Sequence, residues 1–321
     1  MVRKIKRLAV LTRDCSGVNA ALRAVVRTAD SMGIEVWGVI RHYAGLIKGD
    51  FCHLSRIDVS GILNNGGTIL RTSRCKEFMT EEGQRKALAQ IQNHNIDALV
   101  VIGGNGSLAG AHVLATKYGV QVVGIPATID NDINGVEMSI GADTAVNVAM
   151  EAIDKIRDTA FSLERIFVVE VMGRKSGYIA SQVALAGGCE ELLIPEVNDD
   201  FSTLLANIKE GNQRGKVSWI IVVAEGRAKA HDVAQKISEA TGLETRVAVL
   251  GHIQRGGRPT AFDRILAARL GNYAVQVLVE GVTDVCVRLK TGELGVIPLE
   301  EAIQPKDFDF VAEAALIKIL T

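Results

Sequence analysis

The chain has 321 residues, of which 48% are hydrophobic and 23% are charged. This is an ordinary globular composition, and the length allows one large α/β domain or two smaller ones. Its 36 lysines and arginines nearly balance its 37 aspartates and glutamates, for a net charge of −1. The overall charge therefore argues against a nucleic acid or an anionic membrane as partner.

The cysteines indicate a reducing compartment. There are five, and they are scattered without the CxxC spacing of a zinc site or a redox motif. The N-terminus leads into a short apolar strand without the core of a signal peptide. No segment approaches the ~18 apolar residues that span a bilayer. We therefore expect a cytoplasmic protein that contacts no membrane.

Short runs rich in valine and isoleucine predict buried strands along the whole chain. These runs are Leu8–Leu11, Val36–Ile40, Ala98–Ile102, Val120–Ile125, Ile166–Val171, Leu192–Ile194, Trp219–Val223 and Val247–Leu250. Amphipathic stretches between them predict helices at Asn19–Ser31, Gln84–Gln92, Thr144–Arg157 and Asp232–Thr241. Most strands are apolar on both faces, as in a parallel sheet covered by helices. The alternation predicts a doubly wound α/β fold, with its sites at the carboxyl ends of strands.

The strand Ala98–Ile102 runs into Gly103-Gly104-Asn105-Gly106-Ser107 and then an apolar helix. Glycines at such a turn let backbone N–H groups approach phosphate oxygens, helped by the helix N-terminus. The spacing is neither that of a Walker A loop nor that of GxGxxG. From the glycines alone, a tight turn without a ligand is an equally good interpretation.

The next strand leads into Thr128-Ile129-Asp130-Asn131-Asp132. One carboxylate can deprotonate an attacking hydroxyl while the other helps to hold a cation or a sugar. An isolated DND is more often an Asx-rich turn. Its place one strand after the glycine turn favours a functional site.

Charged and polar groups also follow the later strands. Arg174, within Met172–Gly177, can stabilise a transferring phosphoryl group, and Glu225 follows the strand Trp219–Val223. Arg246, His252 and Arg255 flank the last predicted strand. Each is more often a surface residue than a ligand, but so many at strand ends indicate a site.

The chain resembles the bacterial ATP-dependent 6-phosphofructokinases over essentially its whole length. The matching runs include Gly66-Gly67-Thr68, VVIGGNGS, PATIDNDI, VVEVMGR, AGGCE, VLGHIQRGG and FDRILAARLG. The resemblance implies two α/β domains, with 1–141 plus 254–304 on the nucleotide side and 142–253 plus 305–321 on the sugar-phosphate side. It also implies transfer of a phosphoryl group from MgATP to the 1-hydroxyl of fructose 6-phosphate, in a homotetramer whose active sites are shared between subunits.

The resemblance also implies roles for individual residues. Asp130 is similar to the catalytic base, and Arg174 to the cation of the transition state, with Thr128 beside them. The implied substrate-binding residues are Thr128, Asp130, Asp132, Arg165, Met172, Gly173, Arg174, Glu225, Arg246, His252 and Arg255. The implied nucleotide-binding residues are Tyr43, Arg74, Cys75, Gly104, Asn105, Gly106, Ser107 and Gly110. The implied effector site, for ADP or phosphoenolpyruvate, is Arg23, Arg27, Arg56, Arg157, Glu190, Arg214 and Lys216.

The departures from the family pattern lie on the nucleotide side. The loop Thr12–Asn19 is two residues shorter than the family's TSGGDAPGMN and lacks its paired glycines. Asn105 places an amide where the family has a metal-binding aspartate, so Asn105 and Asp132 are the remaining metal-ligand positions for Mg²⁺ with ATP. Ala127 also replaces a glycine, while Gly106 is retained, which disfavours pyrophosphate as donor.

Three hypotheses follow from this combination. The first is an ATP-dependent phosphofructokinase, slowed by its altered loop Arg13–Gly17. The second is a catalytically weak paralogue that binds fructose 6-phosphate and an effector, as a sensor or a regulatory subunit in a hetero-oligomer. The third, another small-molecule kinase with a GGDG-type loop, does not account for the full-length match. The first is slightly favoured over the second.

Overall fold

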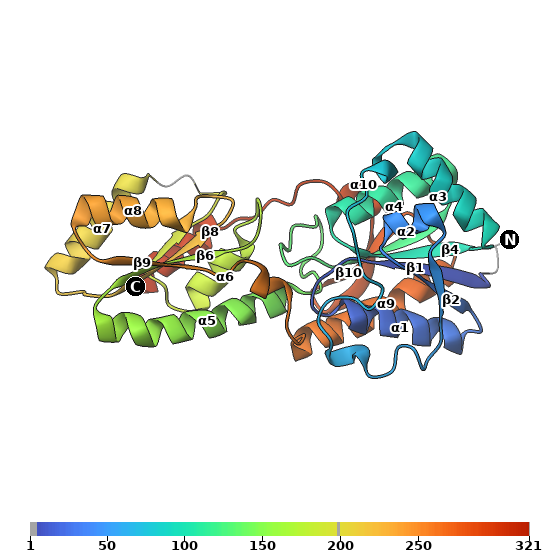
Figure 1. Cartoon of the computed structure of the whole chain (residues 1–321), viewed down its shortest axis with the longest axis horizontal. Coiled ribbons are helices and arrows are strands. Elements are labelled where there is room, and N and C mark those ends of the chain that lie inside the picture. The colour runs from blue at the N-terminus through green and yellow to red at the C-terminus, as the bar shows by residue number, and fades with distance from the viewer. Residues whose placement is uncertain (1–4, 198–199, 321) are drawn as a thin grey trace. The chain divides into compact units, whose positions relative to one another are not determined.

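The structure is a computed structural model that describes residues 5–197 and 200–320. The outermost ends of the expected domain ranges, at residues 1–4 and 321, lie outside the described residues. The described chain forms two compact units, residues 1–144 with 255–306 and residues 145–254 with 307–321. We call them unit 1 and unit 2 and describe each by itself (Figure 1).

Unit 1 is built on a seven-stranded sheet in the order β11-β10-β5-β4-β1-β2-β3. Its elements in chain order are β1 (Arg7–Thr12), α1 (Val18–Ser31), β2 (Glu35–Val39), α2 (Tyr43–Lys48), β3 (Phe51–Leu54), η1 (Ile62–Asn64), η2 (Glu77–Met79), α3 (Glu81–Asn93), β4 (Ala98–Gly103), α4 (Asn105–Tyr118), β5 (Gln121–Pro126), α9 (Ala261–Val279), β10 (Val285–Lys290), β11 (Glu293–Pro298) and α10 (Leu299–Ala302). Figure 1 shows α1 and α9 on one face of this sheet and α3 and α4 on the other. The central strands β1, β4 and β5 are almost completely buried between these layers.

Unit 2 has a four-stranded sheet in the order β7-β8-β6-β9, with every pair parallel. Its elements are α5 (Ala142–Leu163, whose first turn belongs to unit 1), β6 (Ile166–Val171), α6 (Tyr178–Ala186), β7 (Glu191–Leu193), α7 (Phe201–Gln213), β8 (Trp219–Ala224), α8 (Ala230–Thr241), β9 (Thr245–Val249), η3 (Gly251–Arg255, which ends in unit 1) and α11 (Val311–Leu320). Its core gathers side chains of β6, β8, α7 and α8, such as Val168, Ile221 and Ile237.

The expectation of an α/β fold with parallel sheets is confirmed, with three local corrections. The seven-stranded sheet of unit 1 is mixed, because β3 and β11 pair antiparallel with their neighbours at its two edges. The strand expected at 192–194 is β7 at Glu191–Leu193, and the one expected at 247–250 is β9 at Thr245–Val249, an edge strand whose residues are half-buried or exposed. The helix expected at 144–157 extends over Ala142–Leu163.

The start of α5 is anchored to α9 by one buried carboxylate. Asp263 accepts hydrogen bonds from the backbone N–H groups of Gly141 (2.8 Å) and Thr144 (2.9 Å) and from the Thr144 hydroxyl (2.5 Å). Burial raises the pKa of the Asp263 carboxyl, while these donors partly offset the effect. The anchor holds the point at which the chain leaves unit 1.

Candidate functional site

The shortened loop after β1 is held by side chains rather than by glycine turns. The hydroxyl groups of Thr12 and Thr68 form a hydrogen bond, with their oxygens 2.6 Å apart. The Cys15 thiol donates to the carbonyl oxygen of Ile140 at 3.3 Å, and the Ser16 hydroxyl donates to that of Gly257 at 3.0 Å. The loop is therefore ordered by contacts to segments that are distant in sequence.

Arg13 turns toward the segment that precedes Arg74. Its Nη1 donates to the Thr72 hydroxyl at 3.1 Å and to the Ser73 carbonyl oxygen at 2.9 Å. Its aliphatic stem covers Gly103, where an added Cβ would lie 2.8 Å from the Arg13 Cγ. The Arg13 stem thus lies against the first glycine of the turn after β4, while its guanidinium is held at residues 72–73.

The glycine turn leads from β4 into α4, as the sequence predicts. Gly104 precedes the helix, and no side chain caps the helix N-terminus. The Asn105 Nδ2 donates to the carbonyl oxygen of Asp132 at 3.1 Å, which leaves its buried Oδ1 without a hydrogen-bond partner among the described residues. The turn after β4 is thereby tied to the turn after β5.

Asn105 does not fit the role of a magnesium ligand that its position implies. Mg²⁺ prefers oxygen ligands and is bound in proteins mainly through carboxylates. Position 105 offers only the uncharged amide oxygen Oδ1, which is buried and without a hydrogen-bond partner among the described residues, and the charge of Lys306 lies close to the Asp132 carboxylate. We therefore derive no step through a metal held at Asn105.

Two further residues of the nucleotide side pack inside unit 1. Tyr43 is 7% exposed, stacks on Phe78 with ring centroids 3.9 Å apart, and donates its hydroxyl to the Ser107 carbonyl oxygen at 2.6 Å. An added Cβ at Gly110 would lie 2.7 Å from the Tyr43 ring. Cys75 packs half-buried against the same core, whereas Arg74 is exposed.

His42 is a residue of this region that sequence reasoning missed. It is 2% exposed, lies edge-on to the Tyr43 ring at 4.3 Å, and has no hydrogen-bond partner for Nε2 among the described residues. Its backbone has φ 59 and ψ −139, a conformation that glycine adopts with much less strain. Burial and the charge of Arg13 together lower the pKa of His42 to about 3.

The acidic turn after β5 is well buried. Asp130 is 3% exposed, and its backbone N–H donates to the Thr128 hydroxyl at 3.2 Å. Asn131 has a left-handed φ of 48, and its side chain accepts from the Ser139 N–H at 2.9 Å. The Asn131 side chain therefore holds this turn to residues 137–139 and does not form an Asx-turn.

Lys306 also joins this turn, which the sequence did not indicate. Its Nζ donates to the carbonyl oxygens of Asn131 and Val136, both at 2.9 Å. Burial lowers the pKa of Lys306 to about 8, although the nearby carboxylates of Asp132 and Glu137 act in the opposite direction. Lys306 is 175 residues from Asn131 in the chain, so no local pattern could reveal it.

In unit 2, the residues after β6 and β8 form one cluster. The Arg174 N–H donates to the Glu225 carboxylate at 3.0 Å, and Arg174 has a left-handed φ of 54. The Met172 N–H donates at 2.9 Å to Oε1 of Gln254, a buried side chain that the sequence interpretation did not include. Gly173 lies between them with φ 142.

Arg165 and Arg246 are paired through a third residue. Both guanidinium groups form ion pairs with Glu244, Arg165 at 2.8 Å. The parallel register of β6 and β9 sets Ile166 opposite Thr245, so the preceding residues Arg165 and Glu244 are neighbours. His252 is exposed in η3, and Arg255 at its end belongs to unit 1.

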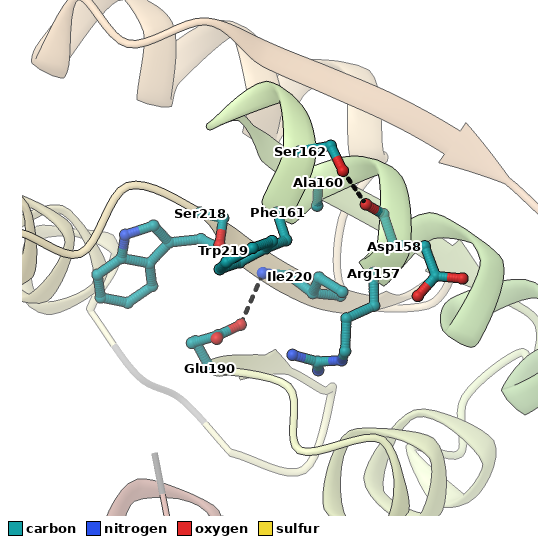
Figure 2. Close-up of a pocket in the computed structure, with 9 residues that line it drawn as sticks. All are labelled: Arg157, Asp158, Ala160, Phe161, Ser162, Glu190, Ser218, Trp219 and Ile220. Carbon is teal, nitrogen blue, oxygen red and sulfur yellow. Dashed lines mark hydrogen bonds between the residues drawn. The ribbon is translucent and has the colours of Figure 1, made fainter.

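Part of the expected effector set lines a pocket of about 510 Å³ in unit 2 (Figure 2). The lining residues are Arg157, Asp158, Ala160, Phe161, Ser162, Glu190, Ser218, Trp219 and Ile220. Arg157 donates to the carbonyl oxygens of Gly187 and Gly188. Glu190 accepts from the Ile220 N–H at 2.7 Å and pairs with Lys216 at 3.2 Å.

The other expected effector residues lie outside that pocket. Arg214 is exposed and pairs with Glu210 within α7 and its C-cap. In unit 1, Arg23 and Arg27 lie half-buried on α1, and Arg56 pairs with Asp30 at 3.1 Å. Each half of the set is thus ordered within its own unit.

A family model described as phosphofructokinase matches residues 7–278 of this chain. The chain belongs to the phosphofructokinase family. A protein of Thermotoga neapolitana named ATP-dependent 6-phosphofructokinase is 53% identical over 94% of this chain and 95% of its own length. One of the same name from Halalkalibacterium halodurans is 51% identical over the same share of this chain.

Solved phosphofructokinases share the fold of this family member. The crystal structure of Pichia pastoris phosphofructokinase in the T-state matches with a TM-score of 0.87 and 34% identity. The match covers 94% of this chain and 38% of the yeast chain. A pyrophosphate-dependent phosphofructokinase from Marinobacter aquaeolei matches with a TM-score of 0.83 at 22% identity, which shows the fold alone. No helix in the described part of this phosphofructokinase-family chain is long and apolar enough to cross a membrane.

Proposed function

We propose that this chain transfers the terminal phosphoryl group of ATP to the 1-hydroxyl of fructose 6-phosphate. The observation that carries the proposal is the buried Asp130 in the turn that follows β5, in a chain 53% identical to a protein named ATP-dependent 6-phosphofructokinase. A buried carboxylate at the carboxyl end of a parallel strand is well placed to accept a proton from a substrate hydroxyl. In this proposal Asp130 is the base.

The other roles follow from charge and position. Arg174 stabilises the charge that develops on the transferred phosphoryl group, and Thr128 lies beside the reacting hydroxyl. Arg165 and Arg246 bind the 6-phosphate, and Glu244 orients both guanidinium groups before the substrate arrives. Met172, Glu225, His252 and Arg255 complete the sugar-phosphate site.

Assembly and regulation are part of the same proposal. The protein is proposed to be a cytoplasmic homotetramer. In such a tetramer, Arg165 and Arg246 would reach the active site of a neighbouring subunit. The pocket at Arg157 and Glu190 is proposed to take part in binding a phosphorylated effector such as ADP or phosphoenolpyruvate. Its guanidinium group and aromatic wall suit an anion attached to a planar or small organic group.

A weakly catalytic paralogue is the second candidate function, and two observations favour it. Asn105 offers only an uncharged amide where the family pattern has a carboxylate, and the Arg13 stem packs against Gly103 in the turn that would hold phosphates. Both features concern nucleotide use alone, so such a family member would still bind fructose 6-phosphate and an effector, and act as a sensor or a regulatory subunit.

Purified full-length protein distinguishes the two functions. Isothermal calorimetry gives the affinities for fructose 6-phosphate and ATP, and a coupled assay gives turnover. Turnover within about tenfold of the ~1–100 s⁻¹ usual for kinases supports the enzyme. Binding of the sugar phosphate with turnover lower by a factor of ~1,000 or more would support the paralogue. Absence of fructose 6-phosphate binding would overturn both.

A further inference from the structure

The loop that follows Asp130 is held by a segment much later in the chain. This loop comprises residues 131–137, and the Asn134 backbone N–H donates to the carbonyl oxygen of Ala302 at 3.1 Å. The Asn134 Nδ2 donates to the carbonyl oxygen of Glu301, also at 3.1 Å. Both acceptors lie in α10, and all of these residues belong to unit 1. The loop after the proposed base is therefore fixed to the last elements of the same unit.

Lys306 joins the start of this loop to its end. Its Nζ donates to the carbonyl oxygens of Asn131 and Val136, both at 2.9 Å. An ammonium group has three donors and no acceptor, so one side chain can bind two carbonyl oxygens at once. Lys306 is the last residue of unit 1, directly after the segment that holds Asn134.

The contact between Lys306 and the loop bears directly on Asp132. The Asn131 carbonyl is part of the peptide group that precedes Asp132, and Lys306 fixes this group. The peptide group that follows Asp132 is fixed as well, because its carbonyl oxygen accepts from the Asn105 Nδ2 at 3.1 Å. Since peptide groups are planar, fixing both of them sets the direction in which the Asp132 side chain leaves the backbone.

The charge of Lys306 has a use that a neutral donor would not provide. Burial lowers the pKa of Lys306 to about 8, so keeping an ammonium group at this place costs free energy. The carboxylates of Asp132 and Glu137 act in the opposite direction and favour the charged form. Elsewhere in the loop, the neutral amide of Asn134 makes the same kind of bond to a backbone carbonyl. The ammonium group therefore both binds the backbone and balances the negative charge beside it.

We propose that Lys306 is a positioning residue for phosphoryl transfer, which holds Asp132 and the adjoining base Asp130 in a single arrangement toward the substrate. The proposal rests on the proposed function, since it concerns the turn that carries the base. Lys306 acts through the backbone of this turn and not on the reacting atoms. A displacement of about 1 Å can cost ~100-fold in rate, so loss of the contact is expected to reduce turnover far more than substrate binding.

The test compares two variants of the full-length protein that each remove one contact of the same loop. Lys306→Met keeps the length of the side chain and removes its charge and its donors. It is expected to lower kcat in the coupled assay by about 30-fold or more, while the affinity for fructose 6-phosphate in calorimetry changes by less than about threefold. Asn134→Ala removes the bond to Glu301 and is expected to lower kcat by less than about threefold. Losses of similar size in both variants would overturn the proposal, because the loop would then only need to be folded.

Two further variants test the charge and the donors. Lys306→Arg keeps both and is expected to have a kcat about tenfold or more above that of Lys306→Met, whereas equal values would overturn the proposal. Lys86→Met removes an exposed ammonium group from α3 and should leave kcat within about twofold. Urea titration shows whether each variant is folded. Lys306→Gln, which keeps a neutral donor, takes the place of an unfolded Lys306→Met with the same expected outcomes.

The failure of this proposal is separable from failure of the proposed function. If the unmodified protein turns over at the ~1–100 s⁻¹ usual for kinases and Lys306→Met keeps more than about a third of that rate, only the positioning role fails. If the unmodified protein binds fructose 6-phosphate without measurable turnover, the enzyme and the positioning role both fail, and the paralogue function remains.

Discussion

Nη1 of Arg13 lies 2.9 Å from the carbonyl oxygen of Ser73, the residue that precedes Arg74. This hydrogen bond joins the end of β1 to the segment that carries the expected nucleotide-binding residues Arg74 and Cys75. A loop that lacks the family's glycines is thus stabilised by a side chain, and that side chain brings a full positive charge.

Asn105→Asp is expected to raise turnover in saturating Mg²⁺ by about 10- to 100-fold, because it restores a carboxylate at the phosphate turn and one such contact is typically worth ~100–1,000-fold. The coupled assay measures it. Asn93→Asp at the exposed end of α3 is the matched control. No gain in Asn105→Asp would place the defect elsewhere, in the shortened loop.

Asp130→Asn is expected to reduce kcat by ~100- to 10,000-fold, the range for loss of a general base. The substitution is isosteric, so the affinity for fructose 6-phosphate measured by calorimetry should change by less than about threefold. Asp232→Asn, an exposed carboxylate in the first turn of α8, is the control. A kcat within about threefold of the unmodified protein would remove Asp130 from the catalytic role.

Asp263→Ala is expected to lower the free energy of unfolding by about 2–4 kcal/mol, because three buried donors lose their acceptor. Urea titration followed by circular dichroism measures it. Thr144→Val removes the side-chain donor to Asp263 and also the acceptor of the Thr260 N–H (3.1 Å), and should cost about 1–2 kcal/mol. Equal losses in the two variants would show that the backbone hydrogen bonds of Asp263 contribute little.

His42 makes the protein sensitive to acid. Burial and the charge of Arg13 lower the pKa of His42 to about 3. Below pH ~6.5 the imidazole is therefore protonated in the unfolded chain but stays neutral in the folded protein. Stability is therefore complete above pH ~6.5 and falls as the pH drops toward 3, by about 2 kcal/mol at pH 5. His42→Gly should remove this part of the pH dependence.

The measurement for His42 is the free energy of unfolding at pH 7.5 and pH 5, compared between His42→Gly and the unmodified protein. His53→Gln changes an exposed histidine on β3 and should leave the pH dependence as it is. A similar loss at pH 5 in the unmodified protein and in His42→Gly would contradict the burial argument.

Arg157 and Arg214 are both expected effector residues, and the structure distinguishes them. Arg157 lines the pocket, whereas Arg214 is exposed and paired with Glu210. Arg157→Met should weaken ADP binding at least tenfold by calorimetry, and Arg214→Met should weaken it by less than about threefold, because an exposed ion pair contributes little. A larger loss of ADP affinity in Arg214→Met than in Arg157→Met would show that the effector does not bind in this pocket.

Much of the fold could be predicted because its signals are local. Runs of valine and isoleucine mark buried strands wherever they occur, and the strand predicted at Ile166–Val171 matches β6 without change. The prediction was less accurate at the sheet edges. There β9 has no fully buried residue, and the antiparallel strands β3 and β11 were not predicted, because edge strands pair on one side only and carry weaker patterns.

The order of motifs along the chain was enough to establish the α/β fold, the family and the unusual composition of the nucleotide side, since each of these is written in neighbouring residues. The position of Arg13 could not be read in this way. Its hydrogen bonds to Thr72 and Ser73 bridge 59 and 60 residues, and they exist because β1 and the later segment meet in space. The loop that lacks the family's paired glycines therefore holds a fixed guanidinium instead, as a consequence of packing between distant parts of the chain.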